Sequence, residues 1–404
     1  MSTDTAWPPP WEAFSRAVDG LDAPLAAVDL DAFDANAEDL LRRAGGTPIR
    51  VASKSVRSRQ LLRSVLDRPG FSGVLAFTLA EAIWLVRTGT SDDVVLGYPC
   101  AERGALAQLC ADPELASQIT LMIDSPAQLD LIDELVPPSS RTEIRVCLDL
   151  DCSLRVGPLV LGARRSPVRT PEQAARAAEH IAARPGFRLV GLMGYEAQVA
   201  GVVDDRRSSL PARLGDLAVR GMKHVSVREL RSRRREVVEA VRRHAELEFV
   251  NGGGTGSLES TDAGGECTEL AAGSGLYGPH LFDGYRGFAP RPAAAFALRV
   301  VRRPAADIVT VHGGGWIASG PTGADRQPSP VWPAGMRLLP AEAAGEVQTP
   351  LRCTSQVPQI GELTWWRHTK AGELCEHVDE LHLIRGEAIV GSAPTYRGEG
   401  MVFL

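Results

Sequence analysis

The chain has 404 residues, of which 44% are hydrophobic and 23% are charged, and its formal net charge is −6. This length exceeds one ordinary hydrophobic core, so we expect two domains of a soluble globular protein. The acidic balance, without a basic run interleaved with aromatic side chains, argues against a nucleic-acid partner. No apolar run approaches the length of a membrane span, which argues against a membrane protein.

The expected location is the cytoplasm. The first ten residues lack both the basic start and the apolar core of a signal peptide. The seven cysteines are scattered along the chain, and no two of them form a CxxC pair. This usage is typical of reduced thiols in a cytoplasmic protein.

The N-terminal part of the chain predicts three elements. Residues 1–21 are rich in proline and tryptophan at first and then helical in pattern, and we expect this segment to pack on the C-terminal domain. Residues 24–30 read as a strand, and Asp31 is suited to cap a helix over residues 32–43.

From Pro48 onward, short apolar runs alternate with amphipathic helical patterns. Eight strand–helix units in series predict a (β/α)₈ barrel, which we place over residues 22–287. A doubly wound open sheet is the competing architecture, but the informative residues follow many different strands, which favours the barrel. The eight apolar runs are residues 48–53, 73–77, 93–97, 119–123, 143–149, 188–194, 247–251 and 268–273.

The composition and the hydrophobic pattern of the sequence change near residue 288. Prolines punctuate short β-like runs, and no long helical pattern remains. We therefore predict a second, all-β domain over residues 288–404. Its clearest strand patterns are residues 295–301, 307–311, 380–384 and 388–390.

The most informative stretch for chemistry is PIRVASKSVR, residues 48–57. It places Lys54 where a buried strand meets its loop. Desolvation at such a place lowers the pKa of a lysine and leaves a neutral amine that attacks a carbonyl. The alternative is a lysine that extends into solvent beyond the end of the strand.

Two glycine-rich loops follow the last two predicted barrel strands. They are NGGGTGS, residues 251–257, and AGSGLYG, residues 272–278. Glycines let backbone N–H groups approach a ligand closely, which suits a phosphate group. Phosphate binding after strands seven and eight is a recurrent barrel arrangement, and we expect both loops to lie opposite Lys54.

Two more motifs follow the fifth and sixth predicted strands. DLDCSLRVG, residues 149–157, supplies acids and Arg155, and GLMGYEA, residues 191–197, supplies Tyr195. A phosphorylated aldehyde held by two glycine loops, a lysine imine, an arginine and an aromatic wall together suggest pyridoxal phosphate.

These motifs, together with PLAAVDLDAFDANAEDL and VASKS, keep their order over nearly the whole chain and resemble a known family. It is the alanine-racemase-type (fold type III) pyridoxal phosphate enzymes, and the branch resembled is the D-threonine aldolase and D-serine dehydratase group. The resemblance implies a barrel with a C-terminal β-domain, usually paired as a homodimer with sites near the subunit interface.

The resemblance also implies roles for single residues. Lys54 holds the cofactor, Arg155 lies beside the phenolic oxygen of the pyridine ring, and Tyr195 lines the ring. The family also implies a base near the tyrosine, yet no histidine lies between residues 191 and 204. The segments implied to hold the phosphate contain Gly253, Gly254, Thr255, Ser274, Gly275 and Tyr277.

The stretch ELCEHVDEL, residues 373–381, predicts the approach to a strand. With a period of two, Cys375, His377 and Asp379 would share one face, which is able to hold a divalent metal. The alternative is a surface pair on an acidic loop. The resemblance implies that His377 and Asp379 bind the metal, Mn²⁺ or Zn²⁺, beside the cofactor, and that His377 takes part in catalysis. Weaker candidates are His312, His368 and His382.

The expected function is a pyridoxal phosphate-dependent lyase acting on D-β-hydroxy amino acids, with metal-assisted retro-aldol cleavage of the D-threonine to glycine type. A D-serine or D-threonine dehydratase is the alternative. A racemase needs a second base, usually a C-terminal tyrosine, and only Tyr396 follows Tyr285. A non-catalytic pyridoxal phosphate carrier and a phosphate-sugar enzyme without the cofactor are further alternatives.

Overall fold

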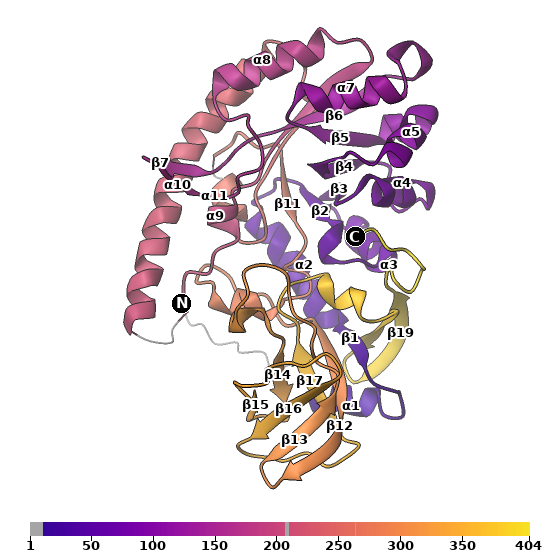
Figure 1. Ribbon diagram of the computed structural model, residues 1–404, viewed down its shortest axis with the longest axis vertical. Helices are drawn as coiled ribbons and strands as arrows, with labels where there is room; N and C mark the ends of the chain where they lie inside the picture. Colours follow the sequence, from indigo (N-terminus) through magenta and orange to yellow (C-terminus); the bar gives the residue numbers. More distant parts are fainter. Residues whose placement is uncertain (1–10, 207–209, 263) are drawn as a thin grey trace.

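The computed structural model describes residues 11–206, 210–262 and 264–404. The chain forms a barrel of strands ringed by helices and, at the other end of the molecule, a domain built on a β-sheet (Figure 1). Within the described ranges, no helix has both the length and the apolarity needed to cross a membrane.

The barrel is closed and consists of eight parallel strands in the order β10-β11-β2-β3-β4-β5-β6-β9. Each predicted apolar run supplies one of these strands, so the predicted (β/α)₈ barrel is confirmed. Strands covered by helices outside and side chains inside are buried on both faces, which is why they read as short apolar runs. The bounds are β2 Ile49–Ala52, β3 Phe71–Ala76, β4 Val94–Pro99, β5 Ile119–Ile123, β6 Ile144–Asp149, β9 Phe187–Gly194, β10 Phe249–Gly252 and β11 Glu269–Ala272.

The helices of the barrel begin at capping residues that the sequence supplies. Thr78 accepts a hydrogen bond from the N–H of Glu81 at the start of α4, and Ser125 and Thr170 form capping boxes at the starts of α7 and α8. The helices are α2 Leu30–Arg43, α3 Arg59–Leu66, α4 Leu79–Arg87, α5 Arg103–Ala111, α6 Pro113–Gln118, α7 Pro126–Leu135, α8 Pro171–Ala182, α9 Ala197–Ala200, α10 Leu210–Arg242 and α11 Leu258–Asp262.

The loops of the barrel carry short elements of their own. A hairpin of β7 (Leu154–Val156) and β8 (Leu159–Leu161) follows β6, and the long helix α10, with 33 residues, runs along one side of the barrel (Figure 1). The 3₁₀ turns are η1 Ser53–Ser55, η2 Pro138–Ser140 and η3 His280–Gly284.

The second sheet has nine strands and confirms the predicted all-β domain. Seven strands follow one another in the order β15-β16-β13-β12-β1-β18-β19, and β17 pairs with both β12 and β14. The strands after the barrel are β12 Ala294–Ala305, β13 Ile308–His312, β14 Ser329–Trp332, β15 Met336–Leu338, β16 Gln348–Cys353, β17 Leu363–Arg367, β18 Glu380–Arg385 and β19 Ala388–Pro394, with 3₁₀ turns η4 Ala324–Arg326 and η5 Glu373–Glu376.

The strand β1 (Leu25–Asp29) belongs to this second sheet. It pairs antiparallel with β12 and parallel with β18, and all five of its residues are buried. Residues 25–29, which the sequence assigned to the barrel, therefore supply a central strand to the β-domain. The barrel domain therefore begins with α2, after this strand.

Both ends of the described chain pack across the molecule. The helix α1 (Trp11–Ala17) lies on β17, where the rings of Trp11 and Trp365 stack at 5.8 Å and the indole N–H of Trp365 donates to Ser15 Oγ at 2.9 Å. Residues 1–10 of the predicted N-terminal segment lie outside the described residues. The C-terminal residues return to the barrel beside α3 and α4, where Tyr396 and Phe403 contact Trp84 (Figure 1).

Candidate active site

Lys54 lies just beyond the carboxyl end of β2, in the turn η1. Its Nζ atom donates a hydrogen bond of 2.6 Å to the hydroxyl oxygen of Tyr98, near the end of β4. The side chain of Lys54 is exposed, so it is accessible at the end of the barrel where barrel enzymes carry their active sites.

The β-domain holds the turn that carries Lys54. The backbone of Gly372 passes so close that a Cβ atom there would lie 1.8 Å from the carbonyl oxygen of Lys54. Farther along the turn, the N–H of Tyr396 donates to the carbonyl of Arg57 at 2.9 Å. Arg57 has φ of 49°, which is uncommon for a residue other than glycine and concentrates at functional sites. The lysine therefore depends on both domains for its position.

The two glycine loops lie beside Lys54, because β11 pairs with β2 and β10 pairs with β11. The expected position opposite the lysine is thus wrong. A Cβ atom on Gly273 would lie 2.6 Å from the carbonyl oxygen of Ala52. The loops are joined by the hydroxyls of Thr255 and Ser274 at 3.1 Å, and the N–H of Gly275 donates to Thr255 Oγ1 at 3.2 Å.

The joined loops present free donors. Within the part of the chain that the structure describes, the backbone N–H groups of Thr255, Gly256 and Ser274 make no hydrogen bond. Backbone N–H groups that converge without partners are suited to bind an anionic oxygen. The two loops therefore have the chemistry of a phosphate site next to the turn that carries Lys54.

Glu196, which the sequence analysis did not single out, accepts hydrogen bonds from the first glycine loop, residues 251–257, and from the helix that follows it. Its carboxylate accepts from the N–H of Gly253 at 3.2 Å and from the hydroxyls of Ser257 and Thr261. It also forms an ion pair of 3.2 Å with Arg234 of α10, and both side chains are buried. Its place directly after Tyr195 in GLMGYEA is the signal that could have identified it.

Tyr195 lies against the first glycine loop. A Cβ atom on Gly254 would lie 3.2 Å from the ring of Tyr195, so the glycine permits this close approach. Burial raises the pKa of Tyr195 to about 12, and the charge of Glu196 adds to the shift. The ring is therefore a neutral, largely apolar wall beside the loop.

Arg155 makes an ion pair within its own motif. Its guanidinium pairs with Asp151 at 2.7 Å, and its side chain is half exposed on the β7–β8 hairpin. Instead Arg165, which the sequence did not indicate, lies over the ring of Tyr98 with 5.7 Å between Cζ and the ring centroid. The role of Arg155 beside a cofactor stays a prediction.

Tyr277 points away from the glycine loop that contains it. Its side chain is fully buried, and its hydroxyl donates to the carbonyl of Val56 at 2.7 Å, behind the Lys54 turn. Any contact of this residue with a phosphate would therefore involve its backbone.

Residues 373–379 lead into a strand, as predicted, but the period-two face expected for Cys375, His377 and Asp379 is wrong. Residues 373–376 form η5, and β18 begins only at Glu380, so alternate residues do not share a face. Cys375 is buried, His377 stacks on Trp316 with ring centroids 4.6 Å apart, and Asp379 pairs with Arg397 at 3.1 Å. The physical reason is Gly372, whose φ of 88° starts a tight turn at the Lys54 carbonyl.

The donor set for a metal is incomplete in this arrangement. Among the residues described, no three His, Cys, Asp or Glu side chains are grouped so that they could hold an ion. The imidazole of His377 and the carboxylate of Asp379 suit Mn²⁺ or Zn²⁺ in chemistry, but a protein site normally has three or more ligands. A metal on these two residues would therefore need at least one further ligand.

The remaining histidine candidates lie elsewhere. His368 is buried beside Tyr277, and burial, with Arg367 and His280 nearby, lowers its pKa to about 3. It is therefore neutral and packed in the domain interior. His312 ends β13 and His382 lies within β18, both in the β-domain sheet.

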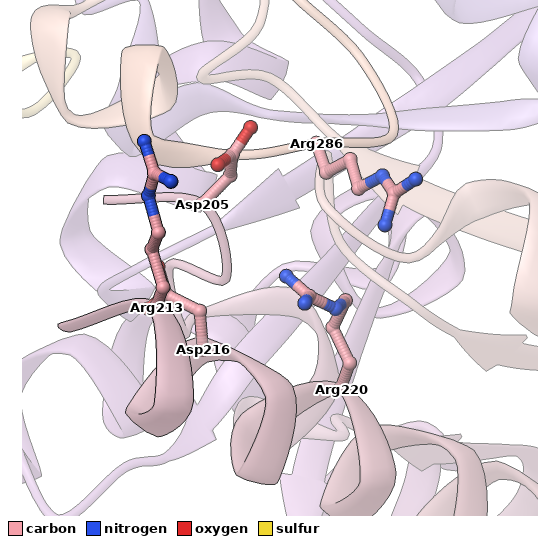
Figure 2. A pocket seen from close by; sticks show the side chains of 5 residues that line it. All are labelled: Asp205, Arg213, Asp216, Arg220 and Arg286. Carbon is pink, nitrogen blue, oxygen red and sulfur yellow. The ribbon is translucent and has the colours of Figure 1, made fainter. Parts of the chain in front are cut away.

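A separate hollow of about 400 Å³ lies at the start of α10. Figure 2 shows Arg213, Asp216 and Arg220 on α10 and Asp205 and Arg286 on the facing segments. Asp216 accepts from Arg206 at 2.8 Å, and Arg220 donates to the carbonyl of Asp204 at 2.8 Å. Lys54 does not line this hollow, so it is not the candidate active site.

Fold and site together define a class: a parallel barrel with a lysine after its first strand, joined glycine loops after its last two strands, and a β-domain that completes the lysine turn. The family described as "Alanine racemase, N-terminal domain" matches residues 28–280, more than half of the chain. The chain belongs to this family, and the resemblance that its motifs indicated is confirmed.

Individual relatives are distant. The chain is 24% identical over 259 residues to the 3-hydroxy-D-aspartate aldolase of Paracoccus denitrificans (strain Pd 1222), covering 63% of this chain and 60% of that protein's length. The D-threonine aldolase of Filomicrobium marinum has a TM-score of 0.77 at 21% identity, covering 95% of this chain and 96% of its own. The D-threo-3-hydroxyaspartate dehydratase of Delftia sp. HT23 has a TM-score of 0.69 at 18% identity, covering 93% and 98%. At such identities the two structures show a shared fold.

Proposed function

We propose that this protein is a pyridoxal phosphate-dependent lyase that cleaves D-3-hydroxy amino acids by a retro-aldol reaction. One observation carries the proposal: the turn that bears Lys54 follows β2, next to the strands that lead into two joined glycine loops with free N–H donors. The named activities of the relatives, aldolases and a dehydratase of D-hydroxy amino acids, support the same substrate class.

The residues present fit pyridoxal phosphate. The N–H groups of Thr255, Gly256 and Ser274 would bind its phosphate, and Lys54 Nζ would attach its aldehyde carbon covalently. The ring of Tyr195 would limit its movement on the glycine-loop side. When bound, this cofactor supplies an electron sink for C2 of an amino acid.

The chain itself positions these groups. The β-domain holds the Lys54 turn through Gly372 and Tyr396, and Glu196 holds the first glycine loop. Such support from buried neighbours fixes the reacting groups within a narrow range of geometry, which a loop alone does not provide.

The reaction products test the proposal. We expect glycine and an aldehyde when the protein, with pyridoxal phosphate, is incubated with D-threonine or D-3-hydroxyaspartate, measured by chromatography. A 2-oxo acid with ammonia would instead identify the dehydratase alternative. A protein that binds no pyridoxal phosphate would contradict the proposal and favour a phosphate-sugar enzyme.

A divalent metal on His377 and Asp379 stays a prediction, and no step is derived from it. The same assay tests it: chelation should remove turnover and leave the cofactor bound, and Mn²⁺ or Zn²⁺ should restore turnover. Full activity after chelation would remove the metal from the proposal.

A racemase is less well supported. Tyr396 is buried, its hydroxyl donates to Glu81 at 2.9 Å, and burial holds its pKa well above the usual range. Its phenol is therefore enclosed and neutral, whereas a second base must reach the substrate and accept its proton. A homodimer and a cytoplasmic location also remain proposals, of which the first is measurable by light scattering.

Gly273→Ala tests the glycine loops. The added Cβ would meet Ala52 O at 2.6 Å, so the loop must move away from the Lys54 turn, and we expect weaker retention of pyridoxal phosphate on dialysis. Gly104→Ala is the matched control, because no atom lies within 4 Å of its Cβ position. Equal retention in both variants would mean that the phosphate binds elsewhere.

A further inference from the structure

Tyr98 is the residue in direct contact with Lys54 that no motif indicated. It lies near the end of β4, and its hydroxyl oxygen accepts from Lys54 Nζ at 2.6 Å. The same Nζ atom is 5.3 Å from the centroid of the Tyr98 ring. The phenol therefore lies beside the atom that is proposed to react, on a rigid strand and not on a mobile loop.

The charged and titratable groups that face Tyr98 come from three other elements. Lys54 approaches from η1, Arg165 from the loop after β8, and Tyr195 from the end of β9. Asp149, at the end of β6, faces Arg165, and burial raises the pKa of Asp149 to about 7. Two cations, Lys54 and Arg165, thus lie close to the phenol.

This environment separates Tyr98 from the other tyrosines of the chain. Burial would raise its pKa, but the charges of Lys54 and Arg165 outweigh this effect and lower the pKa below its usual value. Burial raises the pKa of Tyr195 to about 12 and raises those of Tyr277, Tyr285 and Tyr396 as well. Among the five tyrosines, Tyr98 is therefore expected to ionise first.

We propose that Tyr98 is the catalytic base that takes the proton from the 3-hydroxyl group of the substrate. The inference rests on the proposed function and adds the acid–base group that the sequence did not identify. Its support is the contact with Lys54, the placement on a barrel strand end, and the two facing cations, which stabilise a phenolate.

The step balances within the substrate and this chain. The phenolate oxygen of Tyr98 gains the hydroxyl proton, the hydroxyl oxygen becomes the carbonyl oxygen of the aldehyde, and the bond between C2 and C3 breaks. The electron pair of that bond stays on C2. C2 then gains one proton to give glycine, the same number that the hydroxyl lost, so no oxidant or reductant is needed.

Tyr98→Phe removes the hydroxyl and keeps the ring. We expect kcat to fall by roughly 10²–10⁴-fold with little change in KM, because general base catalysis contributes this range. Pyridoxal phosphate should remain bound, since Lys54 and both glycine loops are unchanged. A kcat within about threefold of the unmodified protein would overturn the proposal, whereas cofactor loss by the unmodified protein would instead refute the proposed function.

A second readout does not depend on turnover. An alkaline titration of the full chain, freed of cofactor and followed by the ultraviolet absorbance of tyrosinate, should lose its first step in Tyr98→Phe. Tyr285→Phe should keep that step, because the Tyr285 hydroxyl is buried and donates to Ala200. If the first step survives in Tyr98→Phe, Tyr98 is not the readily ionised tyrosine and the proposal fails.

Arg165→Gln tests the electrostatic cause. Removing this cation raises the pKa of Tyr98, so both the first titration step and the rising limb of kcat against pH should move to higher pH. Arg164→Gln is the matched control, an exposed arginine one residue earlier in the chain. Equal pH profiles for the two variants would contradict the role of Arg165 in the ionisation of Tyr98.

Discussion

Lys54→Ala should abolish turnover of every D-3-hydroxy amino acid while the protein stays folded. The substitution removes the amine that follows β2, and the exposed side chain contributes no core packing. Borohydride treatment of the unmodified protein should fix pyridoxal phosphate to the peptide that contains Lys54. In Lys54→Ala, the same treatment should fix none.

The other lysines provide the control. The only others in the sequence are Lys223 and Lys370. Lys223 pairs with Asp204 at 2.9 Å in a hollow that Gly256 and Ser257 also line, and Lys370 donates to Ser319 Oγ at 2.9 Å. Lys370→Ala should keep both turnover and labelling. Label on Lys223 or Lys370, or residual turnover in Lys54→Ala, would show that the cofactor is attached elsewhere.

Glu196→Ala should lower the free energy of unfolding by about 3–5 kcal/mol, which is typical when one partner of a buried ion pair is removed. Glu196 and Arg234 have side-chain exposures of only 3% and 4%, so the variant leaves a buried guanidinium without its carboxylate. The first glycine loop also loses its acceptor for the Gly253 N–H. Urea unfolding followed by circular dichroism measures the loss.

Glu143→Ala is the control for this measurement. Its ion pair with Arg188 lies on the surface, with exposures of 54% and 47%, and such pairs contribute at most about 1 kcal/mol. If Glu196→Ala costs no more than Glu143→Ala, Glu196 does not hold the loop as a buried anchor. Pyridoxal phosphate retention, measured in parallel, should fall only in Glu196→Ala.

Much of the fold is predictable from local sequence patterns. The eight barrel strands coincide with the eight apolar runs, because a strand covered on both faces must be apolar throughout and is short. The glycine loops and Lys54 were also visible, since each lies immediately after a strand and parallel barrel strands place their carboxyl ends at one rim. These features depend on neighbours in the chain, so a single sequence suffices to predict them.

The remaining features of the fold and of the site depend on contacts between residues that are distant in the sequence. Nothing near residues 25–29 indicates that β1 pairs with β12 and β18, because a strand's own pattern does not specify its partner. The turn at Gly372, which excludes the period-two face expected for Cys375, His377 and Asp379, follows from close packing on the Lys54 carbonyl. Tyr98 contacts Lys54, and Arg165 contacts Tyr98, only through tertiary packing, and the charges of Lys54 and Arg165 act through space. Residue type and spacing therefore revealed the barrel and its phosphate loops, whereas the acid–base surroundings of Lys54 arise from packing between segments far apart in the chain.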